Sequence, residues 1–313
     1  MNFYLSRNLF MPLVNRILDS FVYKIGVINP VWISSFRIYG SLIFLFHFLS
    51  ILPDFYTFWG QNAIVNPDIM DANIDNIVPT VYDVHQLINK YLALGFQTVV
   101  SSIAIIYMIS LISLTLGFMS KISAAIALLT HLVLMQSINI FIYGVDFMTT
   151  ICLFYFLIFP VGKYHSLDAY FLKKSNPDNF DHGIFLRLFQ IHWCLAYFFS
   201  GLSKALGPTW WNGEAIWKAL NSYNQAGLFN PELWMHYPLM ITFMGISTVL
   251  LELLFPIGVS VKILRKPWIV CIIMMHIGIG ALLGLYFFSI VMILINLVGF
   301  WFPYFKAPTI FSR

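Results

Sequence analysis

The sequence predicts an all-α membrane protein, a bundle of about eight transmembrane helices with both termini in the cytoplasm. Three observations support this fold class. First, 60% of the 313 residues are hydrophobic and 10% are charged, too few charges to cover a soluble domain of this size. Second, the apolar residues gather in runs of about 20, the length that crosses a bilayer. Third, the basic residues fall in alternate loops between these runs.

The chain begins with a segment of a different kind. Residues 1–26 alternate apolar and basic positions, which predicts an amphipathic helix at the membrane interface rather than a cleavable signal peptide. Residues 27–313 are then expected to form one transmembrane domain. Its apolar runs lie at 31–52, 91–117, 121–143, 146–162, 183–206, 235–258, 268–285 and 286–304. No polar residue separates the last two runs, so their division is the least constrained.

The charges of the loops predict the orientation. With the N-terminus in the cytoplasm, the inner segments contain Arg7, Arg16, Lys24, Lys121, Lys163, Lys173, Lys174, Lys262, Arg265, Lys266, Lys306 and Arg313. The outer loop at 53–90 instead contains Asp54, Asp68, Asp71, Asp75 and Asp83. This asymmetry fits the positive-inside rule and places Lys204 near the outer surface. The outer loop is expected to be a solvated cap, with a lid over an outward-facing site as the alternative.

The segment Gln190–Gly213 is the first candidate site. Its apolar helix is expected to end at Gly207-Pro208, because proline cannot continue a helix. Helical spacing places these residues on one face: Arg187, Gln190, Trp193, Tyr197, Ser200, Gly201 and Lys204. A polar stripe on a membrane helix should face the protein interior, where its groups find partners. A helix–helix hydrogen-bonding seam is the structural alternative to a functional site.

Other ionisable residues also lie within the apolar runs. Arg37 and Arg187 lie near inner helix ends, and Glu252 is expected deeper in the membrane. Because charges in a bilayer are usually paired, Glu252 is predicted to pair with Arg37 or Arg187, as a clamp between helices rather than a proton relay. On the outer side, Asn139 and Asp146 flank the turn between two runs, and Asp146 is expected to share a cavity with Lys204.

Histidine and cysteine show no metal-site spacing. Cys152, Cys194 and Cys271 lie inside apolar runs and predict small core residues rather than disulfides or a zinc site. His131, His192 and His276 are expected to form hydrogen bonds between helices. We therefore expect no bound metal. The net charge of +4 is spread over the loops and does not indicate nucleic-acid binding.

Several segments resemble, in order, the HTTM family, whose best-known member is the membrane domain of vitamin K-dependent γ-glutamyl carboxylase. They are SSFRIYGSLIF, ISLTLGFMSKISA, INIFIYGVDF, KYHSLDAY and RLFQIHWCLAYFFSGLSKALGPTWWNGEAI. The second resembles the family's LG…R-I-S turn with Lys121 in place of arginine, and the last resembles its R…Q…YF…G…K…W…G block. Together they cover about residues 31–220. The resemblance implies a short bacterial form, without the carboxylase's lumenal domain, in the inner membrane.

The resemblance also implies a chemistry on the extracytoplasmic side. Lys204 matches the lysine regarded as the base that acts on vitamin K hydroquinone, so a reduced quinone of the menaquinol or vitamin K type is the expected cofactor. Trp193, Tyr197, Trp210 and Trp211 would then be the pocket walls. Lys204, Asn139 and Asp146 are the candidate catalytic residues.

Asn139 stands where the carboxylase has a histidine that assists catalysis, and an amide does not shuttle protons as imidazole does. The expected substrate is a secreted peptide or one delivered by an extracytoplasmic partner protein. The alternative function is a non-catalytic membrane component that binds a partner protein, a lipid or a quinone. A transporter is the weakest hypothesis, because matching pairs of Gly/Pro-broken helices are absent from the sequence.

Overall fold

The computed structural model describes residues 29–65, 78–171, 183–222, 227–228 and 236–304. The amphipathic segment expected at 1–26 lies outside these residues, as do Asp68, Asp71 and Asp75 of the outer loop. The described residues contain helices and no strand, which confirms the all-α class.

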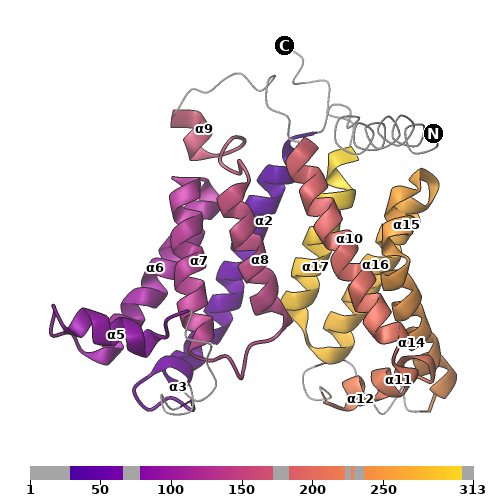
Figure 1. Cartoon of the computed structure of the whole chain (residues 1–313), viewed down its shortest axis with the longest axis horizontal. Coiled ribbons are helices and arrows are strands. Elements are labelled where there is room, and N and C mark those ends of the chain that lie inside the picture. Colours follow the sequence, from indigo (N-terminus) through magenta and orange to yellow (C-terminus); the bar gives the residue numbers. More distant parts are fainter. Residues whose placement is uncertain (1–28, 66–77, 172–182, 223–226, 229–235, 305–313) are drawn as a thin grey trace, which may run out of the picture. The chain divides into compact units, whose positions relative to one another are not determined.

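The longer helices occupy the apolar runs of the sequence (Figure 1). They are α2 (Val31–Ile51), α6 (Phe96–Leu116), α7 (Ser120–Gln136), α8 (Gly144–Ile158), α10 (Gly183–Ala205), α14 (Pro238–Leu253), α16 (Lys262–Leu283) and α17 (Tyr286–Phe300). Shorter helices are α3 (Phe55–Trp59), α5 (Val81–Asn89), α9 (Leu167–Phe171), α11 (Pro208–Trp211), α12 (Glu214–Ser222) and α15 (Phe255–Ser260).

Four helical segments in the described part of the chain are long and apolar enough to cross a membrane. These are Val31–Trp59, Phe96–Leu116, Lys262–Leu283 and Tyr286–Tyr304. The helices α7, α8 and α14 are apolar but shorter. This pattern is that of an integral membrane protein.

Two helix boundaries follow from glycine and proline. Gly284 has a φ of 71° and ends α16, because glycine adopts the left-handed conformation without steric cost. The division expected at residue 285 is therefore a true helix break. The run at 235–258, in contrast, is two helices, because α14 ends at Leu253 and α15 begins at Phe255 with Pro256 in its first turn.

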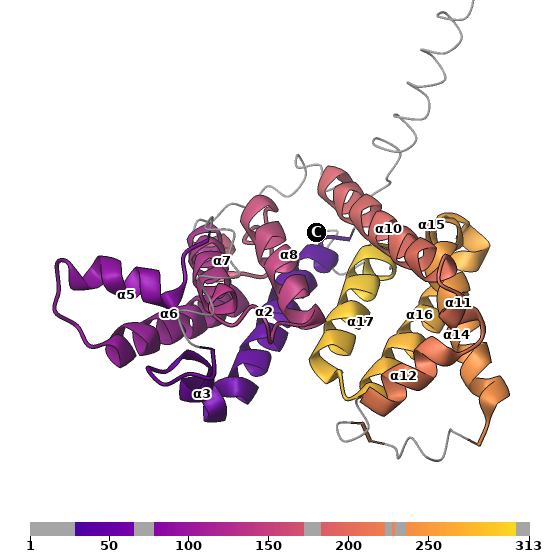
Figure 2. The ribbon, with the colours of Figure 1, turned by 60° about the horizontal axis from the view of Figure 1, so that its bottom comes forward.

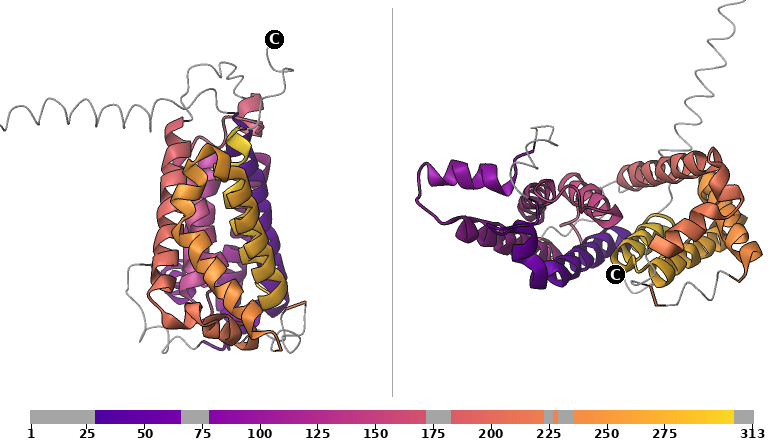
Figure 3. Two further views of the ribbon diagram at one scale, coloured as in Figure 1. Left: turned by 90° about the vertical axis from the view of Figure 1, so that its right-hand side faces the viewer. Right: turned by 90° about the horizontal axis from the view of Figure 1, so that it is seen from below.

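The chain forms two compact units. Unit 1 contains Met1–Trp32, Asn176–Leu285 and Ile295–Arg313, and unit 2 contains Ile33–Ser175 and Tyr286–Leu294. In unit 2, α7 packs between α6 and α8, as Figures 1 and 2 show. In unit 1, α10, α14 and α16 run alongside one another (Figure 3), and α12 packs on both α14 and α16.

A buried arginine joins three segments of unit 2. Arg37 of α2 is fully buried, and its guanidinium donates to the carbonyl oxygens of Leu114 at 3.2 Å and His165 at 2.5 Å. The first carbonyl belongs to the last turn of α6, where backbone oxygens lack helical partners. The Asp168 carboxylate accepts from the backbone N–H groups of Met119 at 2.7 Å and Ser120 at 2.8 Å, which caps the start of α7.

Candidate functional site

A close crossing of α10 and α14 builds the candidate site in unit 1. The crossing is at Gly201, where a Cβ atom would lie 2.3 Å from the backbone nitrogen of Leu253. Only glycine allows the two backbones to approach this closely. One turn later on α10, Lys204 therefore comes within reach of Glu252, the residue before Leu253.

The side chains of Lys204 and Glu252 form an ion pair. The Nζ atom of Lys204 lies 2.6 Å from Oε2 of Glu252, and it also donates to Oγ of Ser200 at 2.6 Å. It lies 5.3 Å from the ring centre of Trp210. The two charged side chains are 20% and 9% exposed. The short charge-assisted hydrogen bonds offset part of the cost of removing the two charges from water.

This pair corrects the prediction made for Glu252. Its ion pair among the described residues is with Lys204, and the two arginines bind other groups. Arg37 donates to the two carbonyls described above, and Arg187 donates to Oε1 of Gln190 at 2.9 Å. Counting residues gives a position along a helix, but it does not reveal which neighbour crosses that helix closely. The glycine at 201 sets this crossing.

Gly201→Ala tests the crossing. The added methyl group collides with the backbone of α14, so we expect a loss of about 1–3 kcal/mol in unfolding free energy. Denaturant titration of the detergent-solubilised protein measures this loss. The matched control is Gly207→Ala, where the new Cβ atom would meet its nearest neighbour at 3.5 Å, an ordinary contact. Equal stability of the two variants would contradict the close approach of the α10 and α14 backbones at Gly201.

A hydrogen-bonded chain adjoins the ion pair. Nδ2 of Asn296 donates to the hydroxyl of Tyr197 at 2.7 Å, and this hydroxyl lies 2.9 Å from Nε2 of His276. The hydroxyl accepts from the amide, so it is free to donate its own proton to the imidazole. Tyr197 lies two turns before Lys204 on the same face of α10. We call Tyr197, Ser200, Lys204, Glu252, His276 and Asn296 the polar cluster.

The predicted stripe on α10 faces the interior of unit 1. Gln190, Trp193 and Tyr197 are buried, and Nε2 of Gln190 donates to the carbonyl of Gly299 at 2.7 Å. The ring of Tyr197 also stacks on Phe255, with 4.2 Å between ring centres. The stripe is thus a helix–helix seam over most of its length, and it ends in the ion pair.

The two tryptophans after α10 differ in role. The ring of Trp210 lies under the Lys204 ammonium, in a cation–π contact. Trp211 is 43% exposed, and its indole N–H donates to the carbonyl of Ala205 at 2.8 Å. This bond satisfies a backbone oxygen at the end of α10. Trp210 therefore adjoins the polar cluster, and Trp211 caps the helix.

Asp146 lies in unit 2, at the start of α8. Its carboxylate accepts from the backbone N–H of Tyr143 at 3.0 Å and lies 4.0 Å from Nδ1 of His47. Its backbone oxygen bonds Nε2 of His131, whose other ring nitrogen lies 3.2 Å from the hydroxyl of Tyr107. The hydrogen bonds between helices expected of His131 and His276 are thus confirmed.

His47 was not among the predicted site residues, although a histidine inside the apolar run LIFLFHFLS was a usable signal. Asn139 lies between α7 and α8, half-buried, and its amide bonds no other described residue. Lys204 belongs to unit 1, whereas Asn139 and Asp146 belong to unit 2. The shared cavity of Lys204 and Asp146 therefore stays a prediction.

Comparison with protein-family models, with curated proteins and with solved structures returns no match for this chain. The HTTM resemblance accordingly stays a prediction from the sequence.

Proposed function

We propose that the protein crosses the membrane about eight times, with both termini in the cytoplasm, and acts through the Lys204–Glu252 pair. A helix in each apolar run and the basic inner loops support this topology. The observation that carries the functional proposal is the 2.6 Å ion pair in an apolar bundle, beside the hydrogen-bonded chain of Tyr197 and His276. Ionisable groups in such a place are costly and are usually retained for function.

The pair supplies a base by internal proton transfer. In the ion pair, Lys204 is an ammonium and Glu252 a carboxylate. A proton passing along their hydrogen bond gives a neutral amine and a carboxylic acid, without change in total charge. The amine then removes a proton from a substrate and becomes an ammonium again, and Glu252 holds the transferred proton.

The resemblance supplies the substrate class. A reduced quinone has an acidic hydroxyl of the kind that such an amine deprotonates. The ring of Trp210 contacts the Lys204 ammonium, and Trp193 and Tyr197 lie on the same face of α10 as Lys204. We propose a menaquinol or vitamin K-type cofactor and a carboxylase-like reaction on a secreted or partner-delivered peptide.

Substitution of Lys204 tests the base. In cells lacking the gene, Lys204→Ala and Lys204→Arg are each expected to abolish rescue, because arginine keeps the positive charge but stays protonated. Rescue is scored on the deletion phenotype and on the masses of secreted peptides. The matched control is Lys218→Ala, which removes an ammonium whose side chain is 61% exposed and should rescue fully. Membrane abundance is measured in parallel.

A non-catalytic component is the second candidate. The observation that favours it is that both polar contacts of the Lys204 amine, to Ser200 and to Glu252, join it to the protein itself. In that case the pair is a clamp between α10 and α14. Full rescue by Lys204→Arg would favour the clamp, since arginine can also bind Glu252. Full rescue by Lys204→Ala would exclude any role of the amine in function.

A further inference from the structure

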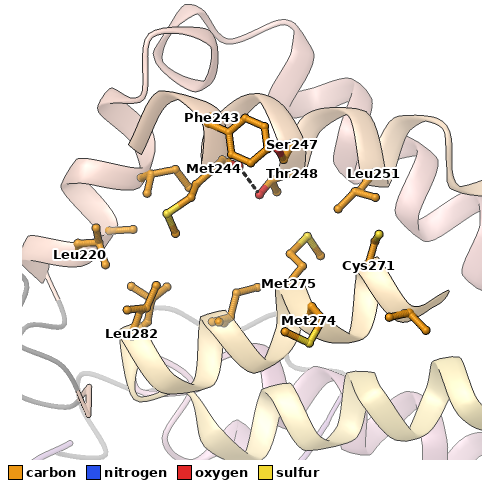
Figure 4. A pocket seen from close by; sticks show the side chains of 16 residues that line it. Leu220, Phe243, Met244, Ser247, Thr248, Leu251, Cys271, Met274, Met275 and Leu282 are labelled. Atoms are coloured by element: carbon orange, nitrogen blue, oxygen red, sulfur yellow. Dashed lines mark hydrogen bonds between the residues drawn. The ribbon is translucent and has the colours of Figure 1, made fainter. Parts of the chain in front are cut away.

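A large apolar cavity is lined by residues of α12, α14 and α16. Its volume is about 450 Å³, and it extends between α14 and α16, with Leu220 of α12 at one end (Figure 4). Ligand pockets in proteins have volumes of about 300–1,000 Å³. The cavity is therefore of the size of a ligand site.

The lining excludes charged and peptide ligands. No lining residue carries a charge, and three are methionines, Met244, Met274 and Met275, whose flexible thioethers adapt to irregular apolar shapes. The hydroxyl of Thr248 bonds the carbonyl of Met244 at 2.9 Å, as Figure 4 shows. The backbone of a bound peptide would find few hydrogen-bond partners on this lining.

The space between α14 and α16 is open at Gly278. A Cβ atom on Gly278, one of the lining residues, would have no neighbour within 4 Å, so the space next to this residue is open. Protein interiors are close-packed, and voids larger than a water molecule are rare. An apolar void also does not retain water. The space is thus suited to an apolar occupant supplied from outside the chain.

The rim of the cavity opens to the surroundings. Phe243 and Met274 line it and are 71% and 61% exposed. Both stand on apolar helices, α14 and α16, so the opening faces the hydrocarbon phase of a membrane. A single hydrocarbon chain fits the space and its chemistry.

We propose that this cavity binds one acyl chain of a bilayer phospholipid, as an ordered lipid that fills the gap between α14 and α16. Leu251 and Met275 line the cavity, and the residues that follow them, Glu252 and His276, belong to the polar cluster. The bound chain thus packs against α14, which carries Glu252 of the ion pair, and against α16, which carries His276 of the polar cluster. The proposal does not depend on catalysis by Lys204, since it concerns binding alone.

Photolabelling tests the proposal. The full chain is placed in nanodiscs of phosphatidylethanolamine that contain a phospholipid with a diazirine in its acyl chain. After irradiation, peptide mapping should find labels at Met244 and Met275. Their yield should exceed by about tenfold the yield at Leu129, which is 63% exposed on α7 of unit 2. Equal yields at these sites would overturn the proposal.

A cavity-filling variant and a matched control sharpen this test. Gly278→Phe places a ring in the open space and should lower labelling at Met244 about tenfold without unfolding the protein. Ile277→Phe changes the neighbouring residue, which is 47% exposed and does not line the cavity, and should leave labelling within about twofold. Gly278→Leu repeats the test with a smaller group.

Two outcomes contradict the acyl chain. Unchanged labelling in folded Gly278→Phe and Gly278→Leu would show that the chain lies elsewhere. Loss of the label on addition of menaquinone, but not of unlabelled phospholipid, would assign the cavity to an isoprenoid tail instead. Displacement by unlabelled phospholipid alone supports the proposal.

Discussion

Glu252→Ala is expected to lower the unfolding free energy by about 3 kcal/mol, because it leaves the ammonium of Lys204 without its carboxylate. Breaking a buried ion pair costs about 3–5 kcal/mol, and the lower value applies because the lysine side chain is still 20% exposed. Denaturant titration in one detergent measures the loss. The control is Glu214→Ala, which breaks the exposed Glu214–Lys218 pair and should leave the stability unchanged.

The double variant Lys204→Met/Glu252→Leu should regain most of this loss. It removes both charges together, and well-packed apolar side chains often replace a buried ion pair without net cost. Recovery would show that the single variant is unstable because of an unpaired ammonium. If the double variant is no more stable than Glu252→Ala, the loss arises from packing at α14 instead. A stable but inactive double variant would separate the function of the pair from its structural role.

Gly117→Ala is expected to cost about 3–5 kcal/mol, for two reasons that add. Gly117 has a φ of 70°, which an L side chain rarely adopts. A Cβ atom there would also lie 1.6 Å from Nη1 of Arg37. The guanidinium would have to leave the carbonyls of Leu114 and His165, and it is fully buried. Folded yield and thermal unfolding in detergent measure the effect.

Gly95→Ala is the matched control for this variant. Gly95 stands at the other end of α6 with a φ of −62°, and its Cβ atom would have its nearest neighbour at 3.9 Å. We expect a change of less than about 1 kcal/mol. Equal stability of Gly117→Ala and Gly95→Ala would mean that Arg37 moves aside without cost. Its hydrogen bonds to Leu114 and His165 would then contribute little to the stability of the protein.

The sequence predicts the helices well and their contacts less well. Apolar runs and a break at Gly207-Pro208 are local signals, and α10 ends two residues before that glycine, at Ala205. The interior face of α10 follows from helical spacing alone. Pro256 was a local signal too, and it marks the start of α15 that the run at 235–258 concealed.

The partner of Glu252 could not be predicted in this way. It depends on how closely α10 and α14 cross, and that distance is set by a glycine 51 positions earlier in the chain, at Gly201. The apolar cavity likewise could not be predicted from the sequence, because its lining residues are of the types that are usual in membrane helices. It is lined by residues of three helices, α12, α14 and α16, and their packing in three dimensions determines its volume.

Three of the segments that resemble the HTTM family meet at one place in unit 2. Arg37 comes from SSFRIYGSLIF, Gly117 from ISLTLGFMSKISA, and Asp168 from KYHSLDAY, whose backbone N–H donates to the carbonyl of Gly117 at 2.9 Å. These residues form hydrogen bonds that hold the ends of helices together. This part of the resemblance therefore concerns contacts between helix ends, whereas the candidate catalytic residues come from the third segment, with Asn139 and Asp146, and from the fifth, with Lys204.

The shortness of the bond between Lys204 and Glu252 has an electrical consequence. A membrane potential of 100 mV does about 2.3 kcal/mol of work on a unit charge carried across the whole bilayer. The nitrogen and oxygen are 2.6 Å apart, so a proton hop between them covers less than a tenth of a hydrocarbon core of about 30 Å. The voltage therefore contributes only about 0.2 kcal/mol to the hop. The distribution of this proton between Lys204 and Glu252 should thus be the same in cells with and without a membrane potential.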